Sequence, residues 1–216
     1  MRQIVKGAEP ASLTAHRQRP PCDYDNYGPK GDLRLALIAE QRGLCCYCMG
    51  RVHNGPLTVK IEHWQCRDRH PDEQLSYRNL LGACLGGHRQ PARLQHCDTR
   101  KGDSDLQWNP AEAAHHIETR VRYELDGSIR ADDAAFDEQL HQVLNLNLAR
   151  LKNNRKGILD AVLEWWKRER ARIGRAVPRS RFERERDKHI ADCGEMAPYS
   201  PVAVWWLGQR LTRMAA

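Results

Sequence analysis

Four cysteines have a spacing that suits a metal site. Cys45 and Cys48 form a C-x-x-C pair, which allows one tight turn to aim two thiolates at the same ion. Cys84 and Cys97 flank a glycine-rich segment and are the best candidates for the two remaining ligands. Because four thiolates bind zinc tetrahedrally, we expect a structural Zn²⁺ that clamps this segment to the C-x-x-C turn and replaces missing hydrophobic core.

Other interpretations of these cysteines stay open. Twelve residues separate Cys84 from Cys97, which is wider than the usual second pair, and His88 and His96 lie in the same segment as competing ligands. The four thiols are also compatible with free buried cysteines. The first ten residues contain no apolar signal region, so we expect a cytoplasmic protein in a reducing compartment, where clustered cysteines indicate metal or catalysis.

Glu62 and His63 lie between the two halves of the predicted zinc site. Residues 57–63 alternate apolar and polar side chains and therefore predict a strand. Successive side chains of a strand point to opposite faces, so one of the pair can hold a metal ion while the other acts as a base. Asn79 follows sixteen residues after His63, and Asp98 comes directly after the last cysteine of the set.

The elements that must position these residues follow local patterns. Prolines and glycines predict an extended arm over residues 1–31, and Asp32 is a plausible N-cap for the next helix. An Asp126–Gly127 pair between alternating residues predicts a β-hairpin. Leucines at helical spacing dominate from Asp132 onward.

The predicted fold is α+β, mostly α. Further helices are expected near 179–192 and from Ser200–Pro201. We expect three parts, which are an extended N-terminal arm over residues 1–31, a metal-binding domain over residues 32–110, and a β-hairpin plus helical region over residues 111–216 that binds partner and DNA.

Charge favours a polyanionic partner modestly. The 216 residues carry 35 Lys and Arg against 28 Asp and Glu, a net charge of +7. Residues 167–188 carry ten basic and four acidic side chains, which suits either a DNA-facing surface or a solvated helix with Glu–Arg pairs. The longest apolar stretches, such as residues 202–207, are far short of the ~20 residues that span a bilayer, so we expect no membrane association.

The order of these motifs resembles the HNH nuclease motif, a ββα-metal finger. The similarity is closer to the PtuB family, the HNH nuclease component of Septu anti-phage systems, which is also found with some retrons. It rests on the N-terminal Met-Arg, Gly-Leu-Cys-Cys-Tyr-Cys-Met at 43–49, Ile-Glu-His-Trp at 61–64, Asn-Leu-Leu-Gly-Ala-Cys at 79–84, His-Cys-Asp-Thr-Arg-Lys-Gly at 96–102 and Val-Leu-Asn-Leu-Asn at 143–147. It spans about residues 1–160 and implies a zinc-stapled ββα-metal (HNH) finger with a helical C-terminal region.

This resemblance implies roles for the motif residues. His63 would be the general base, since a neutral imidazole accepts a proton at cellular pH. Glu62 would be a ligand of a catalytic Mg²⁺ or Mn²⁺. Asn79 would anchor the loop backbone through its amide and so fix the geometry of His63. Asp98 stands where the motif usually has His, and a carboxylate suits a hard ion better than an imidazole does.

Several of these assignments have alternatives. Asp98 is also a plausible helix N-cap, and His96 is a substitute ligand for the catalytic ion. Asn79 is also compatible with an ordinary turn residue. Arg100 and Lys101 are expected to contact substrate phosphates, although simple solvation suits them equally well.

The implied function is metal-dependent hydrolysis of DNA phosphodiester bonds by the effector nuclease of an anti-phage defence complex. Its implied partner is an ABC- or SMC-like ATPase (PtuA-like), for which the proline-rich arm and the tryptophan-bearing C-terminal helix are candidate docking elements. A non-catalytic zinc-ribbon module that binds nucleic acid or acts as an adaptor is the first alternative. A self-standing restriction or toxin nuclease is the second.

Overall fold

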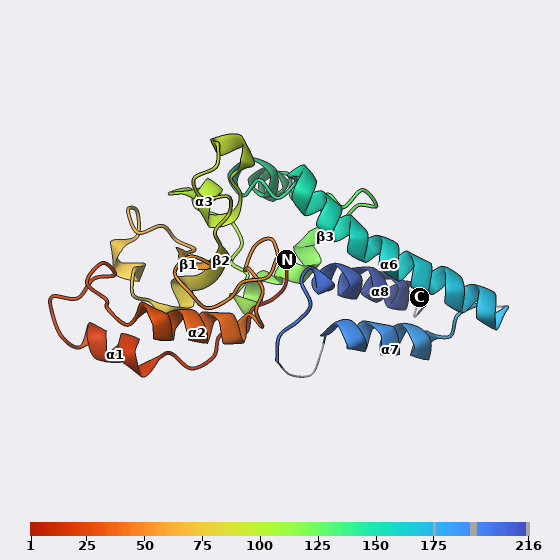
Figure 1. The fold of residues 1–216 in the computed structure, drawn as a ribbon, viewed down its shortest axis with the longest axis horizontal. Helices are drawn as coiled ribbons and strands as arrows, with labels where there is room; N and C mark the ends of the chain where they lie inside the picture. The colour runs from red at the N-terminus through yellow and green to blue at the C-terminus, as the bar shows by residue number, and fades with distance from the viewer. Residues whose placement is uncertain (175, 191–193, 215–216) are drawn as a thin grey trace.

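The computed structural model describes residues 1–174, 176–190 and 194–214 (Figure 1). About 48% of it is helical and the strands form two small two-stranded sheets, which confirms an α+β fold that is mostly α. The helices are α1 Ala11–Arg17, α2 Lys30–Glu40, α3 Cys97–Lys101, α4 Ile117–Arg120, α5 Ala134–Glu138, α6 Ala149–Ile173, α7 Arg179–Ile190 and α8 Ser200–Arg213. The strands are β1 Val59–His63, β2 Leu80–Cys84, β3 Val121–Tyr123 and β4 Ile129–Ala131.

The β1–β2 pair and α3 form the unit that carries the predicted site. The two strands are antiparallel, and their register places Glu62 opposite Leu81 and His63 opposite Leu80. α3 follows the glycine-rich segment and begins at Cys97. This order of strand, strand and helix is compatible with the predicted ββα finger.

The predicted β-hairpin is present, with β3 antiparallel to β4. Its turn contains Asp126 and Gly127, and Gly127 has a left-handed φ of +82°. A Cβ atom on Gly127 would lie 2.0 Å from the carbonyl oxygen of Lys152, so the turn packs directly on α6. The buried guanidinium of Arg155 also donates to the carbonyl of Gly127 at 2.6 Å, which ties the hairpin to this helix.

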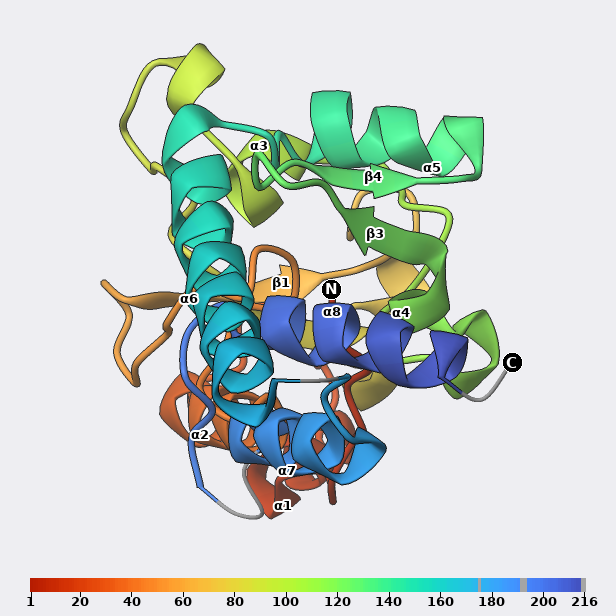
Figure 2. The ribbon, with the colours of Figure 1, turned by 90° about the vertical axis from the view of Figure 1, so that its right-hand side faces the viewer.

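The three C-terminal helices pack together beside the finger (Figures 1 and 2). α8 begins at Ser200–Pro201 as predicted, and α7 covers most of the expected helix, whose residues 191–192 lie outside the described part of the chain. The rings of Trp166 and Trp206 are 6.2 Å apart and join α6 to α8. None of the helices that the structure describes has both the length and the apolar composition that a bilayer crossing requires.

The N-terminal segment differs from the extended arm predicted over residues 1–31. It contains α1, and Leu13 and Tyr27 are buried in a cluster with Leu33 and Leu37 of α2. Leu13 and Tyr27 are too far apart in sequence to show helical periodicity. Tertiary packing against α2 therefore decides their conformation, and local propensity does not.

The larger hydrophobic core contains residues from different predicted parts of the chain. The larger hydrophobic cluster includes Met1 of the N-terminal segment and Leu207 of α8. The boundaries expected at residues 31 and 110 stay predictions. α2 also begins two residues before Asp32, which lies in its first turn, where a carboxylate interacts favourably with the helix dipole.

Candidate functional site

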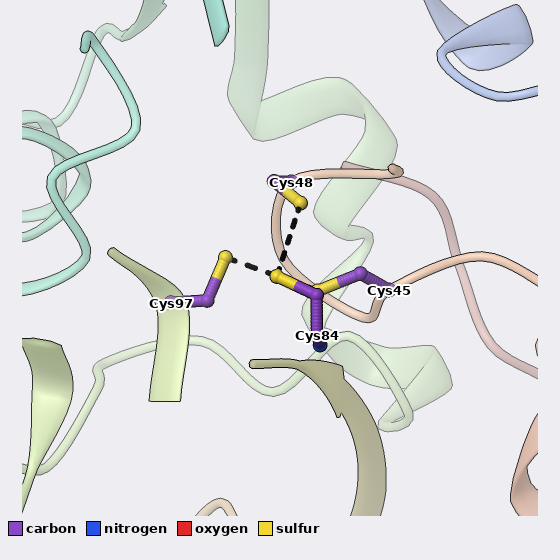
Figure 3. A group of neighbouring side chains, drawn as sticks. All are labelled: Cys45, Cys48, Cys84 and Cys97. Atoms are coloured by element: carbon purple, nitrogen blue, oxygen red, sulfur yellow. Dashed lines mark hydrogen bonds between the residues drawn. The ribbon is translucent and has the colours of Figure 1, made fainter. Parts of the chain in front are cut away.

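The four predicted cysteines converge. Their sulfur atoms all lie within 4.8 Å of one another (Figure 3). The Sγ atoms of Cys45 and Cys97 are 3.8 Å apart, and those of Cys48 and Cys84 are 3.7 Å apart. A tetrahedron of sulfurs around zinc, with Zn–S bonds of about 2.3 Å, has edges of about 3.8 Å. The cluster therefore has the ligand type and spacing to hold a structural zinc ion.

The backbone around the cluster is shaped for thiolates. The C-x-x-C turn closes through a hydrogen bond from the amide of Cys45 to the carbonyl of Gly50 at 2.8 Å. The amide of Gly50 donates to Cys48 Sγ at 3.4 Å, and the amide of Cys84 donates to Cys45 Sγ at 3.3 Å. Such N–H groups stabilise negative sulfur, so the turn favours the ligand form of these residues.

Burial makes it costly for the cluster to carry charge without a cation. Burial raises the pKa of Cys97 well above its ordinary value. Burial also acts to raise the pKa of Cys45, but hydrogen bonds from neighbouring thiols hold it well below its usual range. The surroundings thus favour a negative sulfur on Cys45 and oppose one on Cys97, and a bound zinc ion would offset the cost of that charge.

His96 lies at the edge of this cluster. Its Nδ1 is 3.2 Å from Cys97 Sγ, and its Nε2 is 2.8 Å from a guanidinium nitrogen of Arg150. The side chain is buried and does not line the cleft described next. Its position therefore does not support His96 as the substitute ligand for a catalytic ion.

A polar cleft of about 280 Å³ brings Glu62, His63 and Asp98 together. Glu62 and His63 are neighbours on β1, and Asp98 comes from the first turn of α3. Tyr24 of the N-terminal segment and Lys60 of β1 also line the cleft. Three of the four residues predicted for catalysis thus line one cleft, whereas Asn79 does not.

The two carboxyl groups are linked to each other and to lysines. Glu62 is 2% exposed, accepts from the Tyr47 hydroxyl at 2.7 Å and lies 3.0 Å from Lys101 Nζ. Asp98 lies 2.6 Å from Lys60 Nζ. Each carboxylate therefore has a cationic neighbour of its own.

The surroundings shift the pKa values of Glu62 and Asp98 in opposite directions. Burial raises the pKa of Glu62 well above its ordinary value, and the hydrogen bond to Asp98 adds to this effect. Burial also acts to raise the pKa of Asp98, but the hydrogen bond from Glu62 and the Lys60 ammonium lower it below its usual value. The pKa values of the two acids are therefore shifted in opposite directions, that of Glu62 upwards and that of Asp98 downwards.

His63 is fixed from two sides. Its Nε2 lies 3.0 Å from the carbonyl oxygen of Gln74, and its ring meets the ring of Tyr24 edge-on at 4.5 Å. A carbonyl oxygen only accepts, so Nε2 carries the proton and Nδ1 is left to accept one. Burial lowers the pKa of His63 to about 4, although the hydrogen bond to Gln74 opposes this effect. The imidazole is therefore neutral at cellular pH.

Asn79 holds the loop that carries Gln74. Its Oδ1 accepts from the amide of Gln65 at 2.8 Å, and its Nδ2 donates to the carbonyls of Gln65 and Glu73 at 3.0 and 3.1 Å. The side chain is 3% exposed. One amide thus bonds Gln65 near the start of the loop between β1 and β2 and Glu73 inside it, and the Gln74 carbonyl lies next to His63.

Arg100 and Lys101, which we expect to contact phosphates, do not line the cleft. Lys101 is 2% exposed and donates to the backbone carbonyl of His63 at 2.9 Å, so it is part of the interior. Arg100 is exposed but does not line the cleft, and it donates to the carbonyl oxygens of Gln142 and Ala92. Neither residue lines the cleft, and their expected contact with substrate phosphates stays a prediction.

Lys60 and Arg67 are the basic side chains that do line the cleft. Sequence reasoning missed both. Lys60 precedes Glu62 by two positions on β1, and alternate residues of a strand share a face, so this signal was present. Arg67 follows the strand in an irregular loop, and no periodic pattern places it.

The donor set of the cleft suits a hard divalent ion. Magnesium in proteins is held by one or two carboxylates, with water and substrate oxygens completing its shell, and Glu62 with Asp98 offers such a pair. Within the described residues, no second group of three or more Cys, His, Asp or Glu side chains converges as the four cysteines do. An ion here would therefore depend on solvent or substrate oxygens for most of its ligands.

Comparison with known proteins gives a distant relationship. No protein-family model matches the chain. A segment of 78 residues is 27% identical to the Septu protein PtuB of Bacillus thuringiensis. The aligned segment makes up 36% of this chain and 26% of that protein. The chain thus matches only about a quarter of the length of this relative. The conclusion is a weak similarity to Septu protein PtuB, in a chain whose four clustered cysteines fit a zinc finger of HNH type.

Proposed function

We propose that this chain is a metal-dependent HNH-type endonuclease that hydrolyses DNA phosphodiester bonds. The observation that carries the proposal is the cleft in which Glu62, His63 and Asp98 meet beside a four-cysteine cluster. A neutral imidazole held next to two carboxyl groups is a suitable set for activating water near a bound ion. The order of these residues along β1 and α3 matches the order of the HNH motif.

Each side chain has a distinct role in this proposal. His63 Nδ1 accepts the proton of the attacking water, while Nε2–H stays bonded to Gln74. Asn79 is a positioning residue, because it acts on His63 only through the loop backbone. Glu62 and Asp98 would hold a Mg²⁺ or Mn²⁺ ion through their carboxylate oxygens. Such an ion supplies Lewis-acid stabilisation of the leaving 3′ oxygen.

Lys60 is placed to attract a substrate phosphate into the cleft. Its ammonium lies in the cleft at 2.6 Å from Asp98, with its side chain 31% exposed. An anionic phosphate entering the cleft would attract it away from Asp98. That movement would leave the carboxylate available to the ion.

The similarity to a Septu protein supports a role in anti-phage defence. We propose that the nuclease is the effector of a defence complex with an ABC- or SMC-like ATPase (PtuA-like). A self-standing nuclease would use the same cleft without this partner. Co-purification of the chain with a PtuA-like ATPase separates the two, since only the first predicts a stable complex.

A non-catalytic zinc module remains the second candidate. The observation that favours it is the ion pairing of both carboxylates, Glu62 with Lys101 and Asp98 with Lys60. Lysines so placed weaken the attraction of the cleft for a cation. Such a module would still need the four cysteines, but it would not need His63.

Plasmid nicking by the purified zinc protein tests the proposal, with and without the ATPase. We expect cleavage that requires Mg²⁺ or Mn²⁺ and that falls by about 10²–10⁴-fold in His63→Ala. The control is His53→Ala, because His53 is exposed and lies outside the cleft. Zinc content should be equal in all three proteins. Cleavage by His63→Ala at the wild-type rate would show that His63 is not the base.

A further inference from the structure

A groove of about 810 Å³ opens at the far end of α6, where α6, α7 and α8 meet. We call it the basic groove. Every ionisable side chain that the structure describes in its lining is a cation, and these are Lys167, Arg170, Arg210 and Arg213. Its apolar floor includes Trp166 and Phe182. The basic groove therefore combines four positive charges with aromatic side chains in one lining.

The charge of the basic groove is not balanced by neighbouring acids. Within the described part of the chain, Arg170, Arg210 and Arg213 have no carboxylate partner, although Lys167 pairs with Glu164. α7 is different, because Arg181 pairs with Glu169 of α6 and three further basic residues pair with acids on α7 itself. The pairs on α7 are Arg179–Glu183, Arg186–Asp187 and Lys188–Glu185.

This contrast separates two interpretations of the basic segment 167–188. α7 is a helix with paired charges, and most of its positive potential is neutralised locally. The three groove arginines that lack a carboxylate partner within the described residues instead come from the end of α6 and the end of α8, and they meet in the basic groove. Positive charge that is left unpaired next to an apolar floor is suited to an external polyanion.

Two of the arginines are held in place by an aromatic ring. The guanidinium of Arg210 lies 4.8 Å from the ring centre of Trp166, and that of Arg170 lies 5.9 Å from it. A cation over an aromatic face keeps its full charge while its side chain loses mobility. The N–H groups of these arginines therefore remain available for phosphate oxygens in a partly fixed arrangement.

We propose that the basic groove binds the phosphate backbone of duplex DNA, as a site separate from the cleft. Arg150, near the start of α6, contacts His96 beside the cysteine cluster, and Arg170 lies twenty residues further along the helix. At 1.5 Å per residue this separates the two ends by about 30 Å. The proposal rests on the proposed function only in taking DNA as the polyanion.

Binding of a fluorescein-labelled duplex, followed by anisotropy in EDTA, tests the basic groove without any cleavage. The variant is Arg170→Gln with Arg213→Gln. The matched control is Arg172→Gln with Arg186→Gln, which removes two arginines that are ion-paired and lie outside the basic groove. We expect the groove variant to weaken binding roughly tenfold or more at ~0.1 M salt and to reduce the salt slope by about 2.

The control should keep the affinity within about twofold of the wild type. Equal thermal unfolding midpoints in both variants show that the fold is intact, and Arg213→Gln alone serves if the double variant unfolds. Wild-type affinity in the groove variant, or the same loss in the control, would overturn the proposal. His63→Ala should bind DNA normally while losing cleavage. Failure of the proposal that the basic groove binds DNA can therefore be distinguished from failure of the nuclease assignment.

Discussion

His63 takes its orientation from backbone and ring contacts, and a buried amide fixes that backbone. Asn79 bonds Gln65 and Glu73 in the loop between β1 and β2, and the carbonyl of Gln74, next to Glu73, accepts from His63. The amide touches neither the cleft lining nor a reacting atom. Its effect on the reaction should therefore pass through the position of the imidazole.

Asn79→Ala tests this positioning role. We expect kcat to fall at least ~10-fold while KM for DNA stays within about twofold, because a displaced base slows the chemical step without changing substrate contacts. Asn145→Ala is the matched control, since Asn145 also donates to backbone carbonyls but at Arg93 and Gln95. Unchanged kcat in Asn79→Ala, measured by steady-state nicking, would contradict the role.

Lys60 competes with a divalent ion for Asp98. Removing this half-buried cation in Lys60→Met should tighten Mn²⁺ binding to the zinc-loaded protein about fivefold, the equivalent of ~1 kcal/mol. KM for DNA should rise at the same time, because the phosphate loses a cationic contact. Lys156→Met is the control, since Lys156 pairs with Asp160 on α6. Titration calorimetry with Mn²⁺ that shows no change in Lys60→Met would exclude the competition.

At the scale of elements, the β3–β4 hairpin depends on its close approach to α6. Gly127→Ala should lower the free energy of unfolding by about 3 kcal/mol, because φ is +82° and the new Cβ would meet the Lys152 carbonyl at 2.0 Å. Gly157→Ala lies inside α6 with nothing within 4 Å and should instead stabilise the protein by about 0.5–1 kcal/mol. Urea unfolding measures both, and equal effects would contradict the packing argument.

Local patterns were sufficient for several elements and for much of the site. The Asp126–Gly127 turn, the strand that ends at His63 and the Ser200–Pro201 helix start each depend on neighbours in sequence, so they were predictable. The convergence of the cysteines followed from ligand chemistry. α1 and the burial of Lys101 depend on residues far away in the chain, and no periodic signal shows them.

At the scale of the whole molecule, α8 belongs to the core. Seven of its side chains are buried, among them Trp206 and Leu207, and the same hydrophobic cluster includes Met1. Deleting residues 197–216 should therefore abolish cooperative thermal unfolding, which circular dichroism can follow. A truncated protein that still unfolds in one sharp transition would contradict this packing. Tests of ATPase docking at α8 consequently need surface substitutions, because deletions would disrupt the fold.

The central claim is that a zinc-clamped finger presents His63, Glu62 and Asp98 to a second metal ion and a phosphodiester. Its most direct test is a nicking assay on protein briefly dialysed against EDTA, with zinc measured before and after by mass spectrometry. The account predicts one zinc retained per chain, no cleavage after dialysis, and cleavage restored by Mg²⁺ or Mn²⁺. Protein that keeps its zinc yet leaves plasmid intact with either ion, both alone and with the ATPase, would contradict it.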